Sequence, residues 1–350
     1  MTASAYRLHV LGLALMAAAG SVLDVMEVDA AQYASQSRDM LRQSDWLKLY
    51  WNGNDYLDKP PLLFWLSALS FKVFGVSNWS YKLPSILFAF VGVEATRRFA
   101  LLHHAPETAR RAALIYGGCA AFLLMTSDIR CDTILTASVI LAVWGGVAFV
   151  EQQRWWQLLL LAAAVSSGML VKGPIGAMAP ALAIGGHVVL GRKWRALRDA
   201  RWLLLPALVG LALTPMCIGL YEQFGMHGLR FYFWEQSFGR ITGENKWVDD
   251  STKLYFLHEL PWQVLPWTLF VLLGLAHSLR DAIRRNTLPE HASLAGAVLV
   301  FLALSFSRFK LPHYLYVALP LFAVMGARAW PFAGRRWLRA AHGAVLAIVA

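Results

Sequence analysis

Apolar runs of almost membrane-spanning length recur along the whole chain. They lie at about residues 8–23, 83–102, 112–127, 133–150, 155–171, 174–190, 202–221, 261–279, 293–307, 312–329 and 338–350. A helix needs about 20 mainly apolar residues to cross the hydrocarbon core of a bilayer. Only 15% of the residues are charged, whereas about 25% are charged in a soluble domain. The sequence therefore predicts an all-α polytopic membrane protein with about 11 spans.

One further apolar run, PPLLFWLSALSFKVFG at 60–75, is short and contains Lys72. The distribution of basic residues indicates whether it spans the membrane. If 60–75 lies on the membrane surface, more than half of the 32 Lys and Arg residues fall on the same side as Arg7, and the other side is nearly neutral. That asymmetry is typical of cytoplasmic loops. We therefore predict an interfacial helix at 60–75, a cytoplasmic N-terminus and an uncleaved first span, although residues 1–20 also resemble a cleaved signal.

The first loop, residues 24–61, is unusually polar for this chain. It contains the carboxylates Asp24, Glu27, Asp29, Asp55 and Asp58, and Lys59 stands directly before two prolines. The prolines fix φ and stiffen the turn that carries Lys59. Charged groups at a membrane boundary are costly unless they bind or react with something. We interpret this loop as the core of an active site.

The predicted topology places further polar residues on the same outer side. They are Asp128, Arg130, Asp132, Lys172, Arg308, Lys310, His313, Tyr314 and the 222–260 loop, whose first half is expected to form an interfacial amphipathic helix. Positive charge on the outer side runs against the insertion rule, so it indicates an anionic partner. Phosphate is one candidate for that partner, and a lipid headgroup is the other.

Each candidate residue also has a structural interpretation. Asp29 is suited to act as a general base at a partly desolvated site at the membrane boundary, or as the N-cap of the following helix. Lys59 with Tyr56 suits a phosphate oxygen, but Lys59 and Lys172 are also placed to extend toward headgroups. Asp128 and Asp132 are placed to share Arg130, or to cap the next helix as a loop ion pair.

A metal site is only weakly indicated. His258 and Glu259, with Asp249 and Asp250, offer ligand atoms, but their spacing matches no strong zinc pattern. The sequence also contains no P-loop, dinucleotide fingerprint, GxSxG or HExxH motif.

Five segments in order resemble one known family. They are DAAQYASQSRDML at 29–41, YLDKPPLLFW at 56–65, RCDTIL at 130–135, VKGPIG at 171–176 and SRFKLPHYLY at 307–316. The chain is thereby similar to the ArnT-like and protein O-mannosyltransferase-like glycosyltransferases of the GT-C class, which use polyprenyl-phosphate sugars. The resemblance implies a GT-C-type bundle, with interfacial periplasmic helices in the first outer loop (24–82) and in a later one (222–260).

The resemblance also implies residue roles. Asp29 would activate the acceptor, Asp132 would be a supporting carboxylate, and the substrate and phosphate would contact Tyr56, Asp58, Lys59, Lys172, Lys310 and Tyr314. A divalent metal ion stays open as a cofactor, with Asp58 and His258 as weak ligand candidates. The sequence departs from the family pattern at Ala30, which replaces a second acid, at Gln32, which replaces an arginine, and at Asp58, which replaces a glutamate.

The sequence therefore predicts a single glycosyltransferase domain over residues 1–350 in the bacterial inner membrane, with its active site facing the periplasm. Its donor would be an undecaprenyl-phosphate-linked sugar, and its acceptor a lipid such as lipid A, a glycan or a protein. The alternatives are a flippase for a polyprenyl-linked lipid and a non-catalytic lipid-binding subunit. Because the chain stops inside an apolar run, we expect that further C-terminal spans and a C-terminal periplasmic region are missing.

Overall fold

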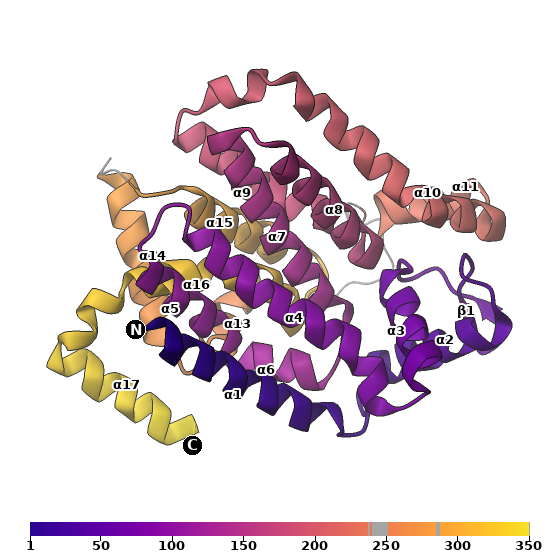
Figure 1. The fold of residues 1–350 in the computed structure, drawn as a ribbon, viewed down its shortest axis with the longest axis horizontal. Helices are drawn as coiled ribbons and strands as arrows, with labels where there is room; N and C mark the ends of the chain where they lie inside the picture. The colour runs from indigo at the N-terminus through magenta and orange to yellow at the C-terminus, as the bar shows by residue number, and fades with distance from the viewer. Residues whose placement is uncertain (237–238, 240–250, 285–287, 350) are drawn as a thin grey trace.

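A computed structural model describes residues 1–236, 239, 251–284 and 288–349, and it is almost entirely helical (Figure 1). The helices are α1 (Ala3–Ser21), α2 (Val28–Gln43), α3 (Leu62–Phe74), α4 (Asn78–Ala100), α5 (Pro106–Gly117), α6 (Ala120–Ser127), α7 (Cys131–Gln152), α8 (Trp155–Lys172), α9 (Ile175–Leu190), α10 (Leu204–Phe224), α11 (Met226–Arg230), α13 (Tyr255–Gln263), α14 (Thr268–Ile283), α15 (Ala292–Phe306), α16 (Leu319–Arg328) and α17 (Arg336–Val349). Short 3-10 turns cover Trp194–Arg198, Ala200–Leu203, η4 (Pro312–Ala318) and Trp330–Gly334, and Phe231–Glu235 forms a π-helical turn. A two-stranded antiparallel hairpin, β1 (Tyr50–Trp51) with β2 (Asn54–Asp55), lies in the first loop.

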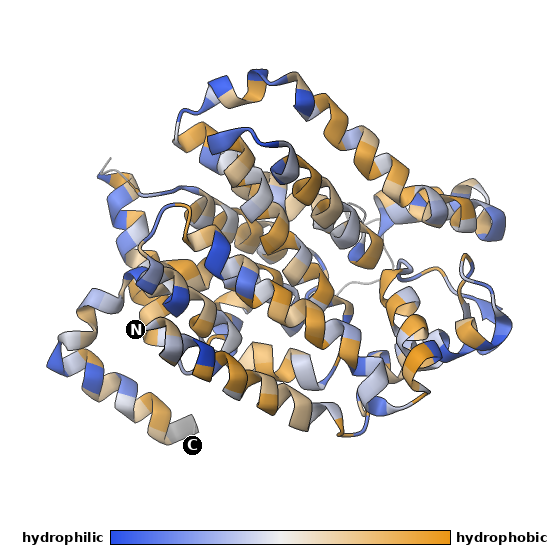
Figure 2. Cartoon of the chain, viewed as in Figure 1, coloured by the Kyte–Doolittle hydropathy of each residue, from blue (hydrophilic) through white to orange (hydrophobic). Residues whose placement is uncertain are grey.

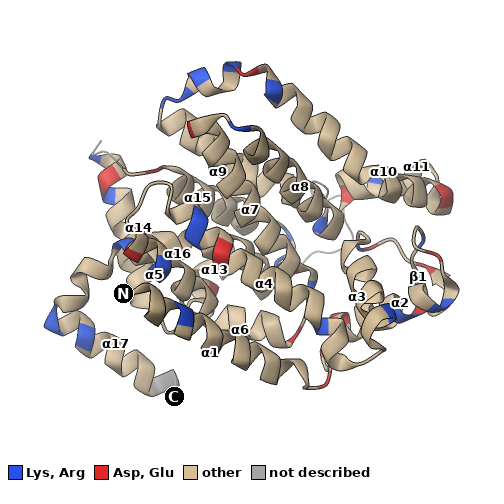
Figure 3. Cartoon of the chain, viewed as in Figure 1, with Lys and Arg blue, Asp and Glu red and all other residues tan. Residues whose placement is uncertain are grey.

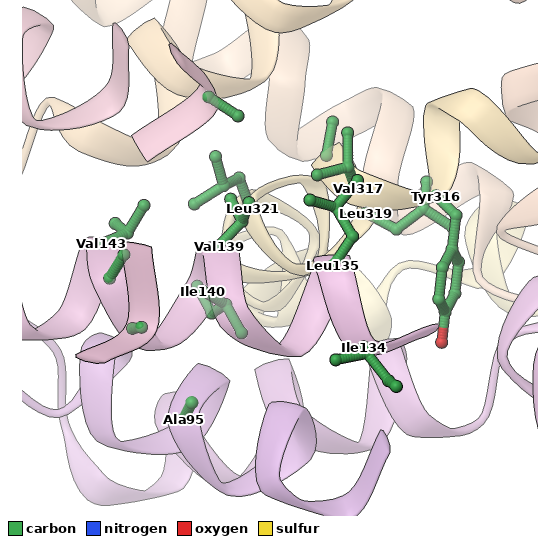
Figure 4. Close-up of a cluster of buried hydrophobic side chains, with 14 of the residues drawn as sticks. Ala95, Ile134, Leu135, Val139, Ile140, Val143, Tyr316, Val317, Leu319 and Leu321 are labelled. Atoms are coloured by element: carbon green, nitrogen blue, oxygen red, sulfur yellow. The ribbon is translucent and has the colours of Figure 1, made fainter. Parts of the chain in front are cut away.

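Helix α7 forms the centre of the molecule. Its most apolar 18-residue stretch is 89% buried, and α4, α8 and α9 pack around it. Figure 4 shows Ile134, Leu135, Val139 and Val143 of α7 beside the buried side chains of η4 and α16, and Ala95 of α4 on another side. A helix that is hydrophobic on all sides must be covered on all sides, which explains why α7 lies in the core.

The peripheral helices instead expose apolar side chains. Only 22% of the most apolar stretch of Ala200–Phe224 is buried, and Leu211 is 72% exposed. Figure 2 shows that α10 and α1, at the edge of the molecule, consist largely of hydrophobic residues. Contiguous exposed apolar surface of this kind marks a membrane or partner interface. Among the described residues, three helices are long and apolar enough to cross a membrane: Cys131–Gln152, Trp155–Lys172 and Ala200–Phe224.

Several predicted apolar runs are interrupted in the structure. The run at 112–127 is divided between α5 and α6 at Gly118 and Cys119. The run at 261–279 is divided between α13 and α14, and the indole of Trp267 in that break donates to the Gly118 carbonyl at 3.2 Å. The run at 312–329 begins as the 3-10 turn η4, with Pro312 at its start, rather than as α-helix. The run at 60–75 forms the 13-residue helix α3.

Charged residues concentrate toward the ends of the helices (Figure 3). Helices α2, α3 and α11 and the hairpin lie at one end, which we call the outer end (right in Figure 1). The loop between α6 and α7 and the break between α8 and α9 also lie there. The opposite, inner end carries the connections between α4 and α5, α7 and α8, and α9 and α10.

The connection from α8 to α9 depends on two glycines. Gly173 follows Lys172 with a φ of +78°, a conformation that side chains with a Cβ disfavour. Three residues later, a Cβ on Gly176 would lie 2.2 Å from the backbone carbon of Gly168. Helices α8 and α9 can approach this closely only because the facing positions 168 and 176 are both glycine.

We predict that Gly176→Ala lowers the melting temperature of the protein in detergent. The added methyl group forces α8 and α9 apart, and overpacking of this kind typically costs about 1–3 kcal/mol. Gly185→Ala is the matched control on the same helix, because a Cβ there meets nothing within 4 Å. It should be neutral or slightly stabilising, since alanine is the better helix former. Equal melting temperatures for the two variants would contradict this account of the packing between α8 and α9.

Candidate active site

Asp29 lies in the first turn of α2, and its side chain is 43% exposed. The N-cap of α2 is Glu27, whose carboxylate accepts the Ala30 N–H at 3.0 Å. The interpretation of Asp29 as the cap is therefore wrong. Burial raises the pKa of the Asp29 carboxyl above its ordinary value, and the Glu27 carboxylate raises it further, while Lys59 and Arg130 act in the opposite direction. A carboxylate with a raised pKa is the better proton acceptor near neutral pH.

Arg130 connects the carboxylates of this region. Its guanidinium nitrogens lie 2.9 Å from Glu27 Oε1, 3.7 Å from Asp29 Oδ2 and 3.7 Å from Asp128 Oδ2. Its Nη1 also lies 3.2 Å from Nδ1 of His313. Burial raises the pKa of Asp128, and Arg130 lowers it. Arg130 thus holds three acidic side chains around one positive charge.

Asp132 belongs to a second group of charges, deeper in the bundle. It is 2% exposed, and its Oδ1 accepts a hydrogen bond from Lys172 Nζ at 2.5 Å. Nε2 of His313 lies 3.7 Å from its other oxygen, and Lys172 Nζ lies 4.3 Å from the centre of the Tyr314 ring. His313 therefore has one ring nitrogen toward Arg130 and the other toward Asp132. Contrary to the sequence interpretation, Asp128 and Asp132 do not form one carboxylate pair around Arg130.

Tyr56, Asp58 and Lys59 lie together in the first loop. Lys59 Nζ is 2.6 Å from Asp58 Oδ2 and is 15% exposed, so it is not a freely extended lysine. Burial raises the pKa of the Tyr56 phenol, and the nearby Asp58 carboxylate raises it further. Gln236 donates to the Asp58 backbone carbonyl. Tyr56 and Lys59 also line a small cavity with Met216 and Leu220 of α10, a helix that exposes much of its apolar surface.

The structure brings the first loop and the Arg130 group to the same end of the bundle. The charges of both Lys59 and Asp58 act on the pKa of Asp29. They also act on the thiol at the start of α7, which lies beside Asp132. Segments that are far apart in sequence therefore surround Asp29.

A cavity of about 540 Å³ opens beside Asp29. Its polar lining consists of Glu27, Asp29, Asp128, Arg130, Glu259, Gln263 and His313, and its apolar lining includes Leu124, Met125, Trp262 and Pro312. The sequence interpretation missed Trp262 and Gln263 on α13. Gln263 donates to the Pro312 carbonyl at 2.6 Å, which fixes α13 against η4. A polar glutamine inside an apolar run was the available signal.

The remaining candidates lie apart from this cavity or outside the described residues. Lys310 is 6% exposed, and its Nζ lies 3.3 Å from both the carbonyl and the hydroxyl oxygen of Ser251. His258 is exposed on α13, whereas Asp58 pairs with Lys59. Asp249 and Asp250 fall outside the described residues. Within residues 1–236, 251–284 and 288–349, no cluster of three possible metal ligands includes Asp58 or His258.

Comparisons with known proteins agree with the fold and give sequence relatives of the chain. The family described as dolichyl-phosphate-mannose-protein mannosyltransferase matches residues 58–218, a range that includes Lys59, Asp132 and Lys172. An undecaprenyl phosphate-alpha-4-amino-4-deoxy-L-arabinose arabinosyl transferase from Pseudomonas paraeruginosa is 28% identical over 307 residues, which cover 85% of this chain and 54% of that protein. The chain thus spans about half the length of the curated relatives it matches.

Solved structures extend this similarity to the fold. The crystal structure of ArnT from Cupriavidus metallidurans bound to undecaprenyl phosphate superposes with a TM-score of 0.83 at 21% identity, covering 99% of this chain and 64% of that one. An oligosaccharyltransferase from Archaeoglobus fulgidus gives a TM-score of 0.58 at 13% identity, covering 96% and 52%. In its motifs, its sequence relatives and its fold, the chain is similar to the ArnT-like glycosyltransferases of the GT-C class.

Proposed function

We propose that this protein transfers a sugar from a polyprenyl-phosphate donor, of the undecaprenyl type, to an acceptor such as lipid A, a glycan or a protein. The observation that carries the proposal is the position of Asp29. Its carboxylate lines a cavity of about 540 Å³, and it lies within electrostatic reach of Lys59, which follows Tyr56 and Asp58 in the first loop. The proton acceptor and the candidate phosphate-binding cation thus act on each other electrostatically, while Lys59 itself lines a separate small cavity with Tyr56.

In the proposed mechanism, Asp29 acts on the acceptor, and Lys59 with Tyr56 acts on the carrier phosphate. Asp29 takes the proton from the acceptor hydroxyl or amine as the acceptor attacks the anomeric carbon. The carbon–oxygen bond to the carrier phosphate breaks, and the phosphate leaves with the bonding electron pair. Lys59 and the Tyr56 hydroxyl stabilise the charge that develops on the phosphate, because preorganised donors are most effective where charge appears. Further cations and a further phenol at the outer end also contact the substrate and its phosphate in this proposal. They are Lys172, Lys310 and Tyr314.

Asp132 has a supporting role in the proposal. It is bonded to Lys172 and lies near His313, so it acts on the reaction by positioning these two side chains. His313 in turn borders the cavity beside Arg130. A divalent metal ion is not assigned to this site, because Asp58 and His258 form no ligand cluster in the part of the chain that the structure describes.

The proposed topology follows from the charge distribution. About 11 spans cross the bacterial inner membrane, the N-terminus is cytoplasmic, and the outer end faces the periplasm. Helices α2 and α3 in the 24–82 loop, and α11 in the 222–260 loop, lie at the membrane surface. The lipid tail of the donor then stays in the bilayer beside α10, while its phosphate reaches Lys59.

We predict that Asp29→Asn abolishes sugar transfer, with a loss of about 10²–10⁴-fold in rate, which is typical for a general base. The measurement is release of free polyprenyl phosphate from a labelled donor in detergent or liposomes. Asp24→Asn is the matched control in the same loop, because Asp24 is exposed and bonds to Asn78 at 2.8 Å. Normal turnover by the Asp29→Asn variant would refute the assignment of the base, and absence of release by the wild-type chain would favour a flippase or a lipid-binding subunit.

The pH dependence of transfer should shift in opposite directions in two variants. Activity requires ionised Asp29, so the rate falls as the pH drops through the raised pKa of this group. Glu27→Gln removes a negative neighbour, lowers that pKa and moves the acid limb of the rate profile to lower pH. Arg130→Gln removes a positive neighbour and moves it to higher pH. Glu259→Gln, on the α13 wall of the cavity, is the control, and a parallel shift in all three variants would contradict the assignment.

We predict a large stability loss from Lys172→Met, because it leaves the Asp132 carboxylate buried without its partner. Breaking a buried pair in this way costs about 3–5 kcal/mol. Asp132→Asn combined with Lys172→Met removes the uncompensated charge and should recover most of the melting temperature without restoring transfer. If the double variant is no more stable than Lys172→Met alone, the two side chains are not energetically coupled.

A further inference from the structure

A second cluster of charged and imidazole side chains lies at the inner end of the bundle, opposite the candidate active site. His103 follows α4, Glu151 is in the last turn of α7, and His187 is in the last turn of α9. One ligand atom from each of these three side chains lies within 4.8 Å of the other two. The cluster thus joins three segments at the end where the charge distribution places the cytoplasm.

The distances within this cluster are close to those of a coordination site. His187 Nε2 lies 2.9 Å and His103 Nε2 lies 3.6 Å from the same oxygen, Oε1 of Glu151. Tetrahedral zinc with ligand bonds of about 2.0–2.2 Å places neighbouring ligand atoms roughly 3.3–3.5 Å apart. Both imidazole nitrogens therefore already lie near this spacing from the Glu151 oxygen, and side-chain rotations that bring all three ligand atoms to this spacing would place them around one cation.

Two buried ring nitrogens, one in this cluster and one on the neighbouring His291, have no hydrogen-bond partner. They are Nε2 of His103 and Nδ1 of His291, and the His291 ring lies 6.1 Å from that of His187. Leaving a buried polar atom unpaired costs free energy, so such an atom in a folded protein needs a reason. In the case of His103, the unpaired nitrogen is the one nearest to the Glu151 carboxylate, which is where a metal ion would supply the missing partner.

We propose that His103, Glu151 and His187 bind one divalent transition-metal cation, with Zn²⁺ as the best chemical match. Two imidazoles and one carboxylate are a common set of protein ligands for zinc, and the fourth position is then filled by water. Imidazole ligands favour zinc and related metals over magnesium or calcium, which prefer oxygen ligands. The bound ion would tie the connection between α4 and α5 to the ends of α7 and α9.

Binding has two costs that the structure makes explicit. Lys193 Nζ lies 2.5 Å from Oε1 of Glu151 and must leave before a cation enters. Its side chain is 32% exposed and borders an open hollow of about 590 Å³, which provides room for that movement and a path for the ion. The His187 Nδ1 atom accepts the His291 N–H at 3.3 Å. Coordination through Nε2 moves the ring proton to Nδ1 and breaks this long hydrogen bond.

The test uses the full chain in detergent, stripped with a chelator and then titrated with Zn²⁺ or Co²⁺. We expect one bound ion per chain by elemental analysis, and the intense visible bands of tetrahedral Co²⁺. His103→Ala should weaken binding at least roughly 100-fold, since even the loss of an outer-shell partner costs 10–100-fold. Lys193→Met should tighten binding, because it removes the competing ammonium group. His258→Ala, at the outer end, is the matched control and should still bind one ion.

Three results would overturn the proposal. The first is no binding by the wild-type chain at micromolar Zn²⁺ or Co²⁺. The second is loss of the ion from His258→Ala with retention in His103→Ala, which would place the metal at the outer end. The third is weaker binding by Lys193→Met, which would show that the cluster is an ion-pair network centred on Glu151. His103→Gln is a second variant at the same position. If it elutes as a monodisperse species and also binds the ion weakly, the loss of binding in His103→Ala is not due to a folding defect.

Discussion

The arrangement of the outer end depends on the buried ion pair between Asp132 and Lys172. Two charges taken out of water are tolerated only when each is paired and further hydrogen-bonded. Here the carboxylate is 2% exposed, and Lys172 stands directly before the glycine break between α8 and α9. Satisfying this pair therefore fixes the ends of α7 and α8 relative to each other. His313 and Tyr314 pack against the same two side chains, so the pair also sets the position of η4, which forms one wall of the cavity.

A second, more exposed layer of charge lies on top of this pair, and it controls Asp29. Arg130 is shared among three carboxylates, so only part of its positive charge is available to stabilise ionised Asp29. Burial and the Glu27 carboxylate outweigh Arg130 and Lys59, and the pKa of Asp29 is raised as a result. The same side chain keeps 43% of its surface exposed. A group that is basic enough to accept a proton and open enough to meet a substrate satisfies both requirements of a general base.

The helices could be predicted from the sequence, but the side-chain pairs could not. Long apolar runs require helices in a bilayer because every backbone polar group must be satisfied internally, and most predicted runs are helices in the structure. The failed pairing of Asp128 with Asp132 has a local cause. Asp128 and Arg130 are both extended, and α7 begins only at Cys131, so the two carboxylates do not share a helical face. The actual partners are 40 residues away at Lys172 and further still at His313, and no local pattern in a single sequence specifies such contacts.

Helix α7 carries a functional candidate at each end, and its length determines how the two ends can interact. Asp132 and Glu151 are separated by about 28 Å along the helix at 1.5 Å per residue. That distance is several times the Debye length of about 8 Å at physiological ionic strength, although screening is weaker inside the bundle. The proposed metal should therefore have little direct effect on the charges around Asp29. Any influence of the inner end on sugar transfer has to pass through packing, and α7 is suited to transmit it because the helix is buried along almost its whole length and close-packed cores transmit strain.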